Sequence, residues 1–215
     1  HATGPDLELV PDWLERYRLM ISVGHDEYWS WGMRDRLDAF LAAGGNAAFF
    51  SGNAVFWQVR LEDEGRSMVS YKYLAHERDP VVGTADERLM TGMWSDPLIG
   101  RPENKTIGVS FKRGGYARIG RPVEQGSGGY TVWRPDHWAF AGTGLRYGDL
   151  LGARHGVVGY ECDGCDMTLV DGLPVPTGED GTPTGFEILG SSPAHLFSNT
   201  PAFTDFPARF PLPPD

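Results

Sequence analysis

A histidine, two carboxylates and a phenol stand together in the segment GHDEYWS, residues 24–30, directly after the apolar run RLMISV. His25 offers a nitrogen ligand or a proton acceptor, and Glu27 offers a hard oxygen ligand. Because alternate side chains of an extended chain point the same way, His25 and Glu27 project together while Asp26 turns away. The spacing favours a shared acid–base or metal-binding role. The alternative is structural: a carboxylate caps the following helix and His25 bonds to the backbone.

Three further polar residues are candidates for the same chemistry. Asn53 can donate and accept hydrogen bonds from one side chain, which suits orienting an amide or an oxyanion, although asparagine after glycine commonly only makes a turn. Lys72, between two tyrosines, offers positive charge for developing negative charge, whereas an exposed strand lysine is otherwise only solvated. Glu161 follows the apolar stretch GVVGY and matters only where the fold brings it to the same crevice.

A strand, a helix and a second strand are predicted to position the first of these groups. Residues 18–23 are apolar and bounded by glycine, which predicts a strand buried on both faces. Ser30 offers an N-cap for a helix over residues 31–43, whose apolar residues recur at helical spacing, and Gly44 ends it. A second apolar strand, residues 46–51, follows at once.

This βαβ unit predicts where the polar groups meet. Its crossover is right-handed in about 98% of known cases and makes the two strands parallel, so their carboxyl ends lie on the same edge of the sheet. In open α/β sheets, ligands bind at that edge. The segments HDEY and SGN are therefore predicted to face one crevice.

The remainder of the chain is predicted to be rich in β-structure and loops. Alternation over residues 57–73 around the turn EDEG predicts a β-hairpin. Short apolar pieces follow, in a chain with 29 glycines and 16 prolines, and predict short strands and long loops. We expect residues 1–55 to form the βαβ part of an α/β core, residues 56–200 the β-rich remainder of the same domain, and residues 201–215 an extended proline-rich tail.

The charge and the cysteine content of the chain indicate which kinds of ligand it binds. The net charge of -10, from 19 basic and 29 acidic residues, argues against nucleic acid and favours a small neutral or cationic ligand. The two cysteines, Cys162 and Cys165, are too few for a disulfide framework or a complete zinc site. No apolar run approaches a membrane span and no signal pattern begins the chain, so we expect no membrane partner and a cytoplasmic location.

Longer stretches of the chain resemble a known family. The stretch GHDEYWSWGMRDRLDAFLAAGGNAAFFSGNAVFWQVRLEDEGRSMVSYK, followed by GRPENKTIGVSF, RPDHWAFAGTGLRYGD and GYECDG, resembles the C-terminal domain of the large (beta) subunit of N,N-dimethylformamidase and its relatives. The likeness runs from about residue 17 to residue 194. It implies a parallel-sheet, class I glutamine amidotransferase-like (flavodoxin-like) α/β core with an inserted or appended β-rich, loop-rich region.

The resemblance also implies an activity and its residues. The family enzyme hydrolyses N,N-dimethylformamide to dimethylamine and formate at a mononuclear iron held by two tyrosines and one glutamate, and the glutamate corresponds to Glu27. The other active-site residues of the family correspond to His25, Asn53, Lys72 and Glu161. We expect iron to polarise the amide carbonyl and Glu161 to pass a proton from the attacking water to the leaving amine. His25 and Asn53 would orient the water and the carbonyl oxygen, and Lys72 would stabilise developing charge.

Two features of the family bear on what this chain does alone. Its tyrosine ligands lie upstream of the GHDEYW strand, where this chain has only about 17 residues, so they are expected outside this chain. We therefore expect a fragment or truncated relative of an iron-dependent hydrolase of a small amide. The family enzyme pairs the large subunit with a small one, and a small subunit or a homo-oligomer stays open here. The alternative is a non-catalytic small-ligand-binding or assembly module on the same fold.

Overall fold

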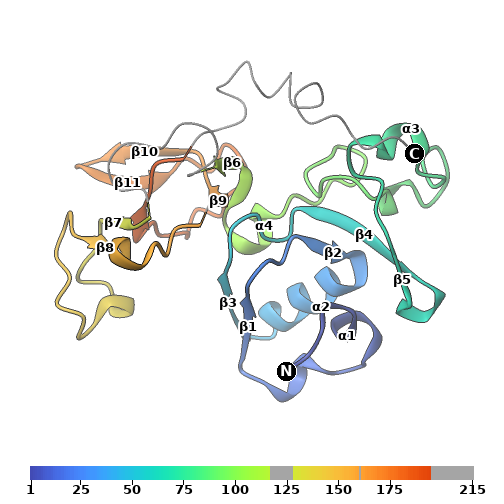
Figure 1. The fold of residues 1–215 in the computed structure, drawn as a ribbon, viewed down its shortest axis with the longest axis horizontal. Coiled ribbons are helices and arrows are strands. Elements are labelled where there is room, and N and C mark those ends of the chain that lie inside the picture. The colour runs from blue at the N-terminus through green and yellow to red at the C-terminus, as the bar shows by residue number, and fades with distance from the viewer. Residues whose placement is uncertain (117–127, 160, 195–215) are drawn as a thin grey trace. The chain divides into compact units, whose positions relative to one another are not determined.

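The computed structural model describes residues 1–116, 128–159 and 161–194 (Figure 1). The chain divides into two compact units, His1–Gly108 and Val109–Asp215, which we describe separately. The proline-rich segment predicted over residues 201–215 lies outside the described residues. No helix in the described parts of the chain is long and apolar enough to cross a membrane.

The predicted βαβ unit is present in the first unit. It consists of β1 (Leu19–Val23), α2 (Trp31–Ala42) and β3 (Asn46–Phe50), and the two strands pair in parallel. The Ser30 hydroxyl accepts a hydrogen bond from the Met33 backbone N–H at 3.2 Å, so Ser30 caps α2 as predicted. Gly44 follows the helix with φ +90°, a conformation that L side chains rarely adopt. Local sequence signals therefore predict this segment correctly.

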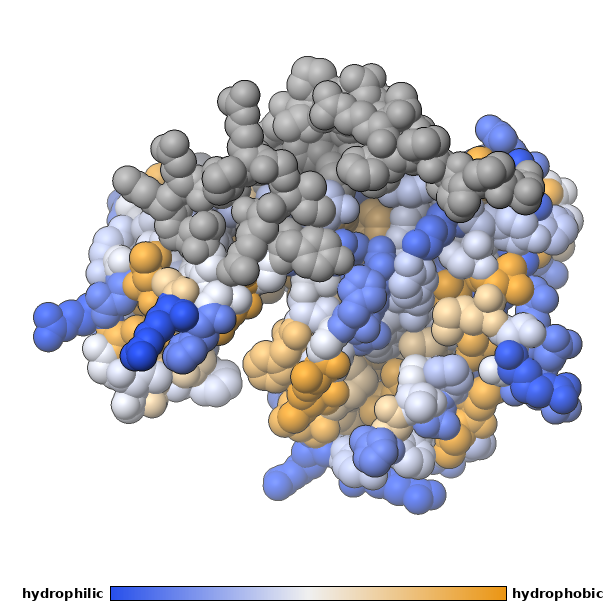
Figure 2. Space-filling model, viewed as in Figure 1, coloured by the Kyte–Doolittle hydropathy of each residue, from blue (hydrophilic) through white to orange (hydrophobic). Residues whose placement is uncertain are grey.

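The prediction that the first strand is buried on both faces is wrong. Alternate side chains of β1 are exposed, Leu19 by 49%, Ile21 by 55% and Val23 by 77%, and Phe50 at the end of β3 is exposed by 66%. The reason is that α2 covers one face of this sheet, and no described element of the first unit covers the other. Figure 2 shows the resulting hydrophobic surface over β1 and β3.

A second sheet of the first unit continues from this segment. Strands β2 (Tyr28–Ser30), β4 (Trp57–Glu62) and β5 (Ser67–Val69) lie in the order β2-β4-β5. Strand β2 runs parallel to β4, and β4 runs antiparallel to β5, which confirms the predicted hairpin as far as Val69. The prediction that Lys72 lies on a hairpin strand is wrong, because Lys72 begins the 3-10 turn η3 (Lys72–Leu74) with φ +52°.

The core of the first unit joins α2 to the loops that follow β3 and β4. The short helix α1 (Gly4–Leu9) packs against α2. The other short helical elements of this unit are η1 (Leu14–Arg16), η2 (Asp63–Gly65), α3 (Ala75–Arg78), η4 (Glu87–Leu89) and α4 (Asn104–Ile107). Buried apolar side chains cluster among these elements, namely Leu7, Leu14, Trp29, Met33, Leu37, Phe40, Ala54, Val55, Ala75, Met90, Trp94 and Ile99.

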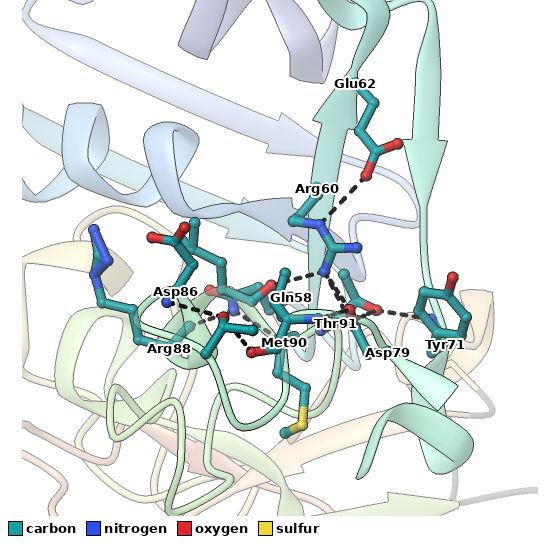
Figure 3. A network of polar contacts seen from close by, with 12 residues as sticks. Gln58, Arg60, Glu62, Tyr71, Asp79, Asp86, Arg88, Met90 and Thr91 are labelled. Atoms are coloured by element: carbon teal, nitrogen blue, oxygen red, sulfur yellow. Dashed lines mark hydrogen bonds and ion pairs between the residues drawn. The ribbon is translucent and has the colours of Figure 1, made fainter. Parts of the chain in front are cut away.

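A buried ion pair fastens the irregular segment 79–91 to β4 (Figure 3). The Arg60 guanidinium donates from Nη1 to both carboxylate oxygens of Asp79 at 2.8 Å, and Thr91 donates its N–H and its hydroxyl to Asp79 Oδ2 at 2.8 Å each. Burial alone raises the pKa of Asp79, but the hydrogen bonds from Arg60 and Thr91 outweigh it and hold that pKa below its ordinary value. Gln58 adds hydrogen bonds to the carbonyls of Arg88 and Met90, both at 2.8 Å.

The second unit consists of short strands and turns, as the glycine and proline content predicts. Its described strands are β6 (Ser110–Tyr116) with β9 (Glu161–Gly164), the hairpin of β10 (Met167–Val170) and β11 (Leu173–Pro176), and the sheet of β12 (Gly190–Ser191), β7 (Tyr130–Val132) and β8 (Leu150–Leu151). All these pairs are antiparallel. Two 3-10 turns, η5 (Trp138–Phe140) and η6 (Ala153–His155), complete the described elements.

Candidate active site around Glu27

The backbone of the first unit brings the ends of β1 and β3 together. The Glu27 carbonyl accepts hydrogen bonds from the N–H groups of Phe56 and Trp57, both at 2.9 Å, and the Asp26 carbonyl accepts one from Val55 at 2.8 Å. The residues that leave β1 are thus joined to those that follow β3. This is the juxtaposition that the parallel βαβ unit predicts.

Glu27 lies at the centre of this junction, and its side chain is 11% exposed. Its Oε1 accepts a hydrogen bond from Asn53 Nδ2 at 2.9 Å and another from the Trp57 indole N–H at 2.8 Å. Its Oε2 lies 2.8 Å from His25 Nε2. Among the described residues, His25 is the only side chain that forms an ion pair with Glu27. The carboxylate is therefore oriented through Oε1 by two neutral donors and faces His25 through Oε2.

Asp26 has a different role from Glu27, as the alternation of an extended chain predicts. Its carboxylate accepts hydrogen bonds from the Ser22 hydroxyl and, at 2.9 Å, from the Trp29 indole. The cap of α2 is the Ser30 hydroxyl. Neither Asp26 nor Glu27 caps the helix, so the alternative that one of these carboxylates caps it is wrong.

Lys72 joins the cluster through aromatic side chains. Its ammonium donates a hydrogen bond to the Tyr28 hydroxyl and lies 4.7 Å from the Tyr28 ring centroid and 5.5 Å from the Trp57 ring centroid. Its backbone N–H donates to the Thr91 carbonyl at 2.9 Å, which fixes the turn that presents it. Lys72 thus approaches Glu27 through Trp57, the residue whose indole binds that carboxylate.

The backbone around this cluster is strained. Asn53, Val55 and Lys72 have φ values of 55°, 54° and 52°, in the left-handed region that favours glycine. The value for Val55 is the most unusual, because a β-branched side chain crowds this conformation. Strained backbone of this kind is held in place only by surrounding packing and concentrates at functional sites. Asp12, Asp63 and Glu64 of the same unit also have positive φ values, so the strained backbone at Val55 supports the candidate site only together with the residue types gathered there.

Sequence reasoning missed the aromatic members of the cluster. Trp57 was predicted only as an alternating strand residue, and its contact with Glu27 depends on the pairing of β2 with β4. The ring of Tyr73 packs edge-on against Trp57, with centroids 4.9 Å apart. Burial, followed by the charges of Glu27 and Tyr28, raises the pKa of the Tyr73 hydroxyl. A buried tryptophan usually has a hydrogen-bond partner for its N–H, and this tendency is the feature from which a polar contact of Trp57 could be predicted.

Glu161 lies on β9 of the second unit, where it pairs in register with Tyr116. The cluster of the first unit contains the other four predicted residues without it. The neighbouring thiols are not paired with each other. Burial, and then the nearby Asp180 and Asp166, raises the pKa of Cys165 to about 11, so this thiol is not a nucleophile at neutral pH.

Two further observations define the limits of the site. A cavity of about 510 Å³ in the first unit is lined by His25 and Asp26, together with apolar residues of β1 and the N-terminal segment, but not by Glu27. The described residues contain no group of three or more His, Cys, Asp or Glu side chains that could hold a metal ion. The carboxylate and its hydrogen bonds, not a cavity or a complete ligand set, therefore define the candidate site.

Comparisons with known proteins place these residues in a family. The family model described as N,N-dimethylformamidase beta subunit-like, C-terminal, matches residues 1–208. The chain is 28% identical over 231 aligned positions to the N,N-dimethylformamidase beta subunit of Paracoccus aminophilus, an alignment that covers 96% of this chain and 26% of the relative. It is 27% identical over 204 positions to the protein of the same name from an Alcaligenes species, covering 85% of this chain and 23% of the relative.

The extent of these matches matters for function. The chain spans about a quarter of the length of the curated relatives that it matches. No solved structure matches the chain. The comparisons thus show the family of the chain. Its architecture follows from the strands described above.

Proposed function

Because the chain belongs to the N,N-dimethylformamidase beta subunit-like C-terminal family, we propose that its Glu27 cluster is part of a centre that hydrolyses a small amide. The observation that supports this most strongly is the single cluster of His25, Glu27, Asn53 and Lys72 in the first unit. The printed names of the relatives point to N,N-dimethylformamide as the first amide to test. Whole-enzyme activity remains a proposal for a chain that spans about a quarter of those relatives.

We propose iron as the metal of this centre, with Glu27 as one ligand. A ligand carboxylate is usually oriented by hydrogen bonds from outside the metal site, and Asn53 and Trp57 supply two such bonds to Glu27 Oε1. Its Oε2 is a hard oxygen donor of the kind that suits ferric iron. Glu27 therefore fits one position of the ligand set, and the two tyrosines that the resemblance implies would come from outside this chain. When bound, iron would polarise the amide carbonyl or lower the pKa of a water molecule.

The other residues of the cluster would orient Glu27 and a water molecule and would stabilise charge on the substrate. The contact between Asn53 Nδ2 and Glu27 changes the expected role of Asn53 from binding the carbonyl oxygen to holding the carboxylate. The imidazole of His25, whose side chain is 52% exposed, would hold a water molecule beside Glu27 Oε2. Lys72 and Tyr28 would balance negative charge that develops on the substrate oxygen.

The assignment of Glu161 as the group that accepts and returns a proton stays a prediction. It rests on the resemblance at the segment GYECDG. A change of Glu161 to Gln keeps the size of the side chain but replaces the carboxylate, which can accept a proton, with a neutral amide, which cannot. If Glu161→Gln hydrolyses the amide at the wild-type rate, the assignment is wrong.

For the fold, we propose a flavodoxin-like core similar to the class I glutamine amidotransferases. Support comes from the parallel pair β1 and β3 with its crossover helix, and from the second parallel pair, β2 and β4. Parallel sheets are normally covered on both faces, so this proposal requires a further layer over the face of β1 and β3 that is exposed in the first unit. An experimental structure of the longest natural polypeptide that contains this sequence tests this proposal.

The proposed activity is tested by measuring dimethylamine release and iron content in parallel. The wild-type chain, Glu27→Gln and the control Glu64→Gln are compared, since the Glu64 side chain is 91% exposed. In the longest natural polypeptide that contains this sequence, where the tyrosine ligands are expected, wild type and Glu64→Gln should hold iron and release amine, and Glu27→Gln should do neither. Amine release without iron would overturn the metal assignment. Neither iron nor amine, in this chain and in the longest natural polypeptide that contains it, would overturn the hydrolase proposal.

The exposed apolar face of β1 and β3 favours a second candidate, an assembly module without catalytic activity. Leu19, Ile21 and Val23 form an apolar row that is costly to leave in water. The relatives are named as beta subunits, which supports a subunit partner. This candidate predicts that Ile21→Lys weakens association in light scattering while the chain binds no iron and releases no amine in any form.

A further inference from the structure

Trp57 contacts the Glu27 cluster but has no role in the proposed function. Its side chain is 2% exposed at the start of β4, and its only hydrogen-bonding atom, the indole nitrogen, is a donor. That N–H donates to Glu27 Oε1 at 2.8 Å, while the Trp57 backbone N–H donates to the Glu27 carbonyl at 2.9 Å. Trp57 therefore holds both the backbone and the carboxylate of the same residue.

The effect on Glu27 is directional. Oε1 takes two neutral donors, from Asn53 and Trp57, so Oε2 is the oxygen that faces His25. A glutamate side chain has several rotatable bonds, and fixing it costs conformational entropy. Two hydrogen bonds to one oxygen fix that orientation before any ligand arrives. This is the preorganisation that a metal ligand or a charge-stabilising group needs.

The ring of Trp57 has a second contact on the other side of the cluster. The Lys72 ammonium lies 5.5 Å from the Trp57 ring centroid, within the range of a cation–π interaction. Tryptophan has the strongest aromatic face for this interaction. Because indole is rigid, the N–H that binds Glu27 and the face near Lys72 keep a fixed separation. Trp57 thus sets the spacing between the anionic and the cationic group of the cluster.

Burial alone does not require this hydrogen bond. Trp94 is fully buried in the same unit, and its indole nitrogen has no hydrogen-bond partner among the described residues. The fold therefore tolerates a buried indole N–H that does not reach a carboxylate. The contact between Trp57 and Glu27 is a specific arrangement, and Trp94 provides a matched control for it.

We infer that Trp57 is a positioning residue, which orients the Glu27 carboxylate through its indole N–H and holds Lys72 at a set distance through its ring. The inference rests on the proposed function, because Glu27 is taken there as a ligand of iron. It assigns Trp57 no contact with the substrate. Removing the N–H while keeping an aromatic ring should therefore change metal binding and turnover without changing amide binding.

The experiment compares Trp57→Phe with Trp94→Phe. Phenylalanine keeps a ring near Lys72 and removes the donor to Glu27, whereas Trp94→Phe removes an indole N–H that binds no carboxylate. Loss of an outer hydrogen bond typically weakens metal binding about 10–100-fold. We expect Trp57→Phe to weaken iron binding by that factor in dialysis against defined iron, and to lower kcat with KM unchanged. Trp94→Phe should keep wild-type iron binding and kcat.

A metal-independent measurement keeps the inference falsifiable. In the iron-free chain, the shift of the urea midpoint caused by Trp57→Phe should shrink when Glu27 is already changed to Gln, because a neutral amide accepts the indole N–H less strongly than a carboxylate. Equal shifts in both backgrounds, or wild-type iron binding by Trp57→Phe, would overturn the role of Trp57 alone. If neither the wild-type chain nor the longest natural polypeptide that contains it binds iron or releases amine, the proposed function is overturned and, with it, this inference.

Discussion

The first unit contains two buried carboxylates that are held in opposite ways. Asp79 binds the Arg60 guanidinium through both oxygens and accepts two more hydrogen bonds from Thr91. Glu27 accepts its hydrogen bonds from the neutral groups of Asn53 and Trp57 and lies beside the ionisable His25. Asp79 is paired with a guanidinium, whereas Glu27 is held by two neutral donors and an imidazole.

The backbone conformation also differs between the region around Glu27 and the region around Asp79. Three non-glycine residues next to Glu27 have left-handed φ values, whereas within residues 79–91 only Gly83 does, at +76°. Glycine adopts this conformation without strain and asparagine adopts it more readily than most residues, whereas valine and lysine are strained in it. Under the proposed function, Asp79 stabilises the fold and Glu27 is oriented for a ligand. The predictions below test this distinction.

The largest expected effect on stability is at Asp79. Asp79→Asn places an amide N–H₂ against the donors of Arg60 and Thr91 and leaves the guanidinium without its anion. Breaking a buried pair in this way costs about 3 kcal/mol, the lower end of the usual range, because the Arg60 side chain keeps 14% exposure. Urea unfolding measures the loss. Amine release per folded chain should stay at the wild-type value, and a parallel loss of activity would contradict the comparison.

The same carboxylate-to-amide change at Glu27 should have the opposite pattern. The carbonyl oxygen of Glu27→Gln still accepts from Asn53 and Trp57, so the free energy of unfolding should change by less than about 1 kcal/mol. Amine release should fall more than about 100-fold, since loss of a metal ligand exceeds the effect of losing an outer hydrogen bond. A variant that unfolds readily, or one that keeps its activity, would show that Glu27 is structural.

Acid should act on the two regions differently. The folded-state pKa of Asp79 lies below its ordinary value of 3.8, so the ion pair stabilises the fold fully above that pH and loses this contribution as pH falls through the lower folded-state pKa. We expect the free energy of unfolding to decrease below about pH 4 in the wild type. In Asp79→Asn, this part of the decrease should be missing. Unfolding followed by circular dichroism from pH 6 to pH 2 makes the comparison.

The smallest expected effect is at Thr91. Thr91→Val keeps the shape of the side chain and the backbone N–H to Asp79, but removes the hydroxyl that donates to Asp79 at 2.8 Å and accepts from the Tyr71 backbone N–H at 2.9 Å. Loss of these two hydrogen bonds, one of them to a charged group, costs about 2 kcal/mol. Because Arg60 still neutralises Asp79, the urea midpoint should move less than in Asp79→Asn. A shift as large as that of Asp79→Asn would mean that Thr91, not Arg60, provides most of the stabilisation.

The sequence allowed the local elements to be predicted, since their signals lie within a few residues of each other. Ser30 and Gly44 mark the ends of α2, and the parallel pairing of β1 with β3 follows from the short crossover. The same reasoning brought Asn53 to Glu27. It failed for β1, whose apolar side chains are exposed, because apolar composition reports a need for burial but not whether a covering element is present.

The contacts between side chains of distant segments could not be predicted from the sequence pattern. Lys72 was expected on a strand and begins a 3-10 turn, since β5 ends at Val69 and the chain adopts a left-handed conformation there. Arg60 was one polar residue in an alternating strand, and its partner Asp79 lies 19 positions away in a segment without regular periodicity. Such pairs depend on long-range packing, which has no local sequence signature.

The sequence by itself determined the family, the βαβ segment and the residue types gathered at the end of its strands, because these depend on local periodicity, capping and short crossovers. Only the tertiary structure decided which carboxylate is neutralised by a guanidinium and which is oriented by Asn53 and Trp57. The physical reason is that hydrogen bonds and ion pairs act over about 3 Å. Their partners here come from segments that meet only when the chain is folded.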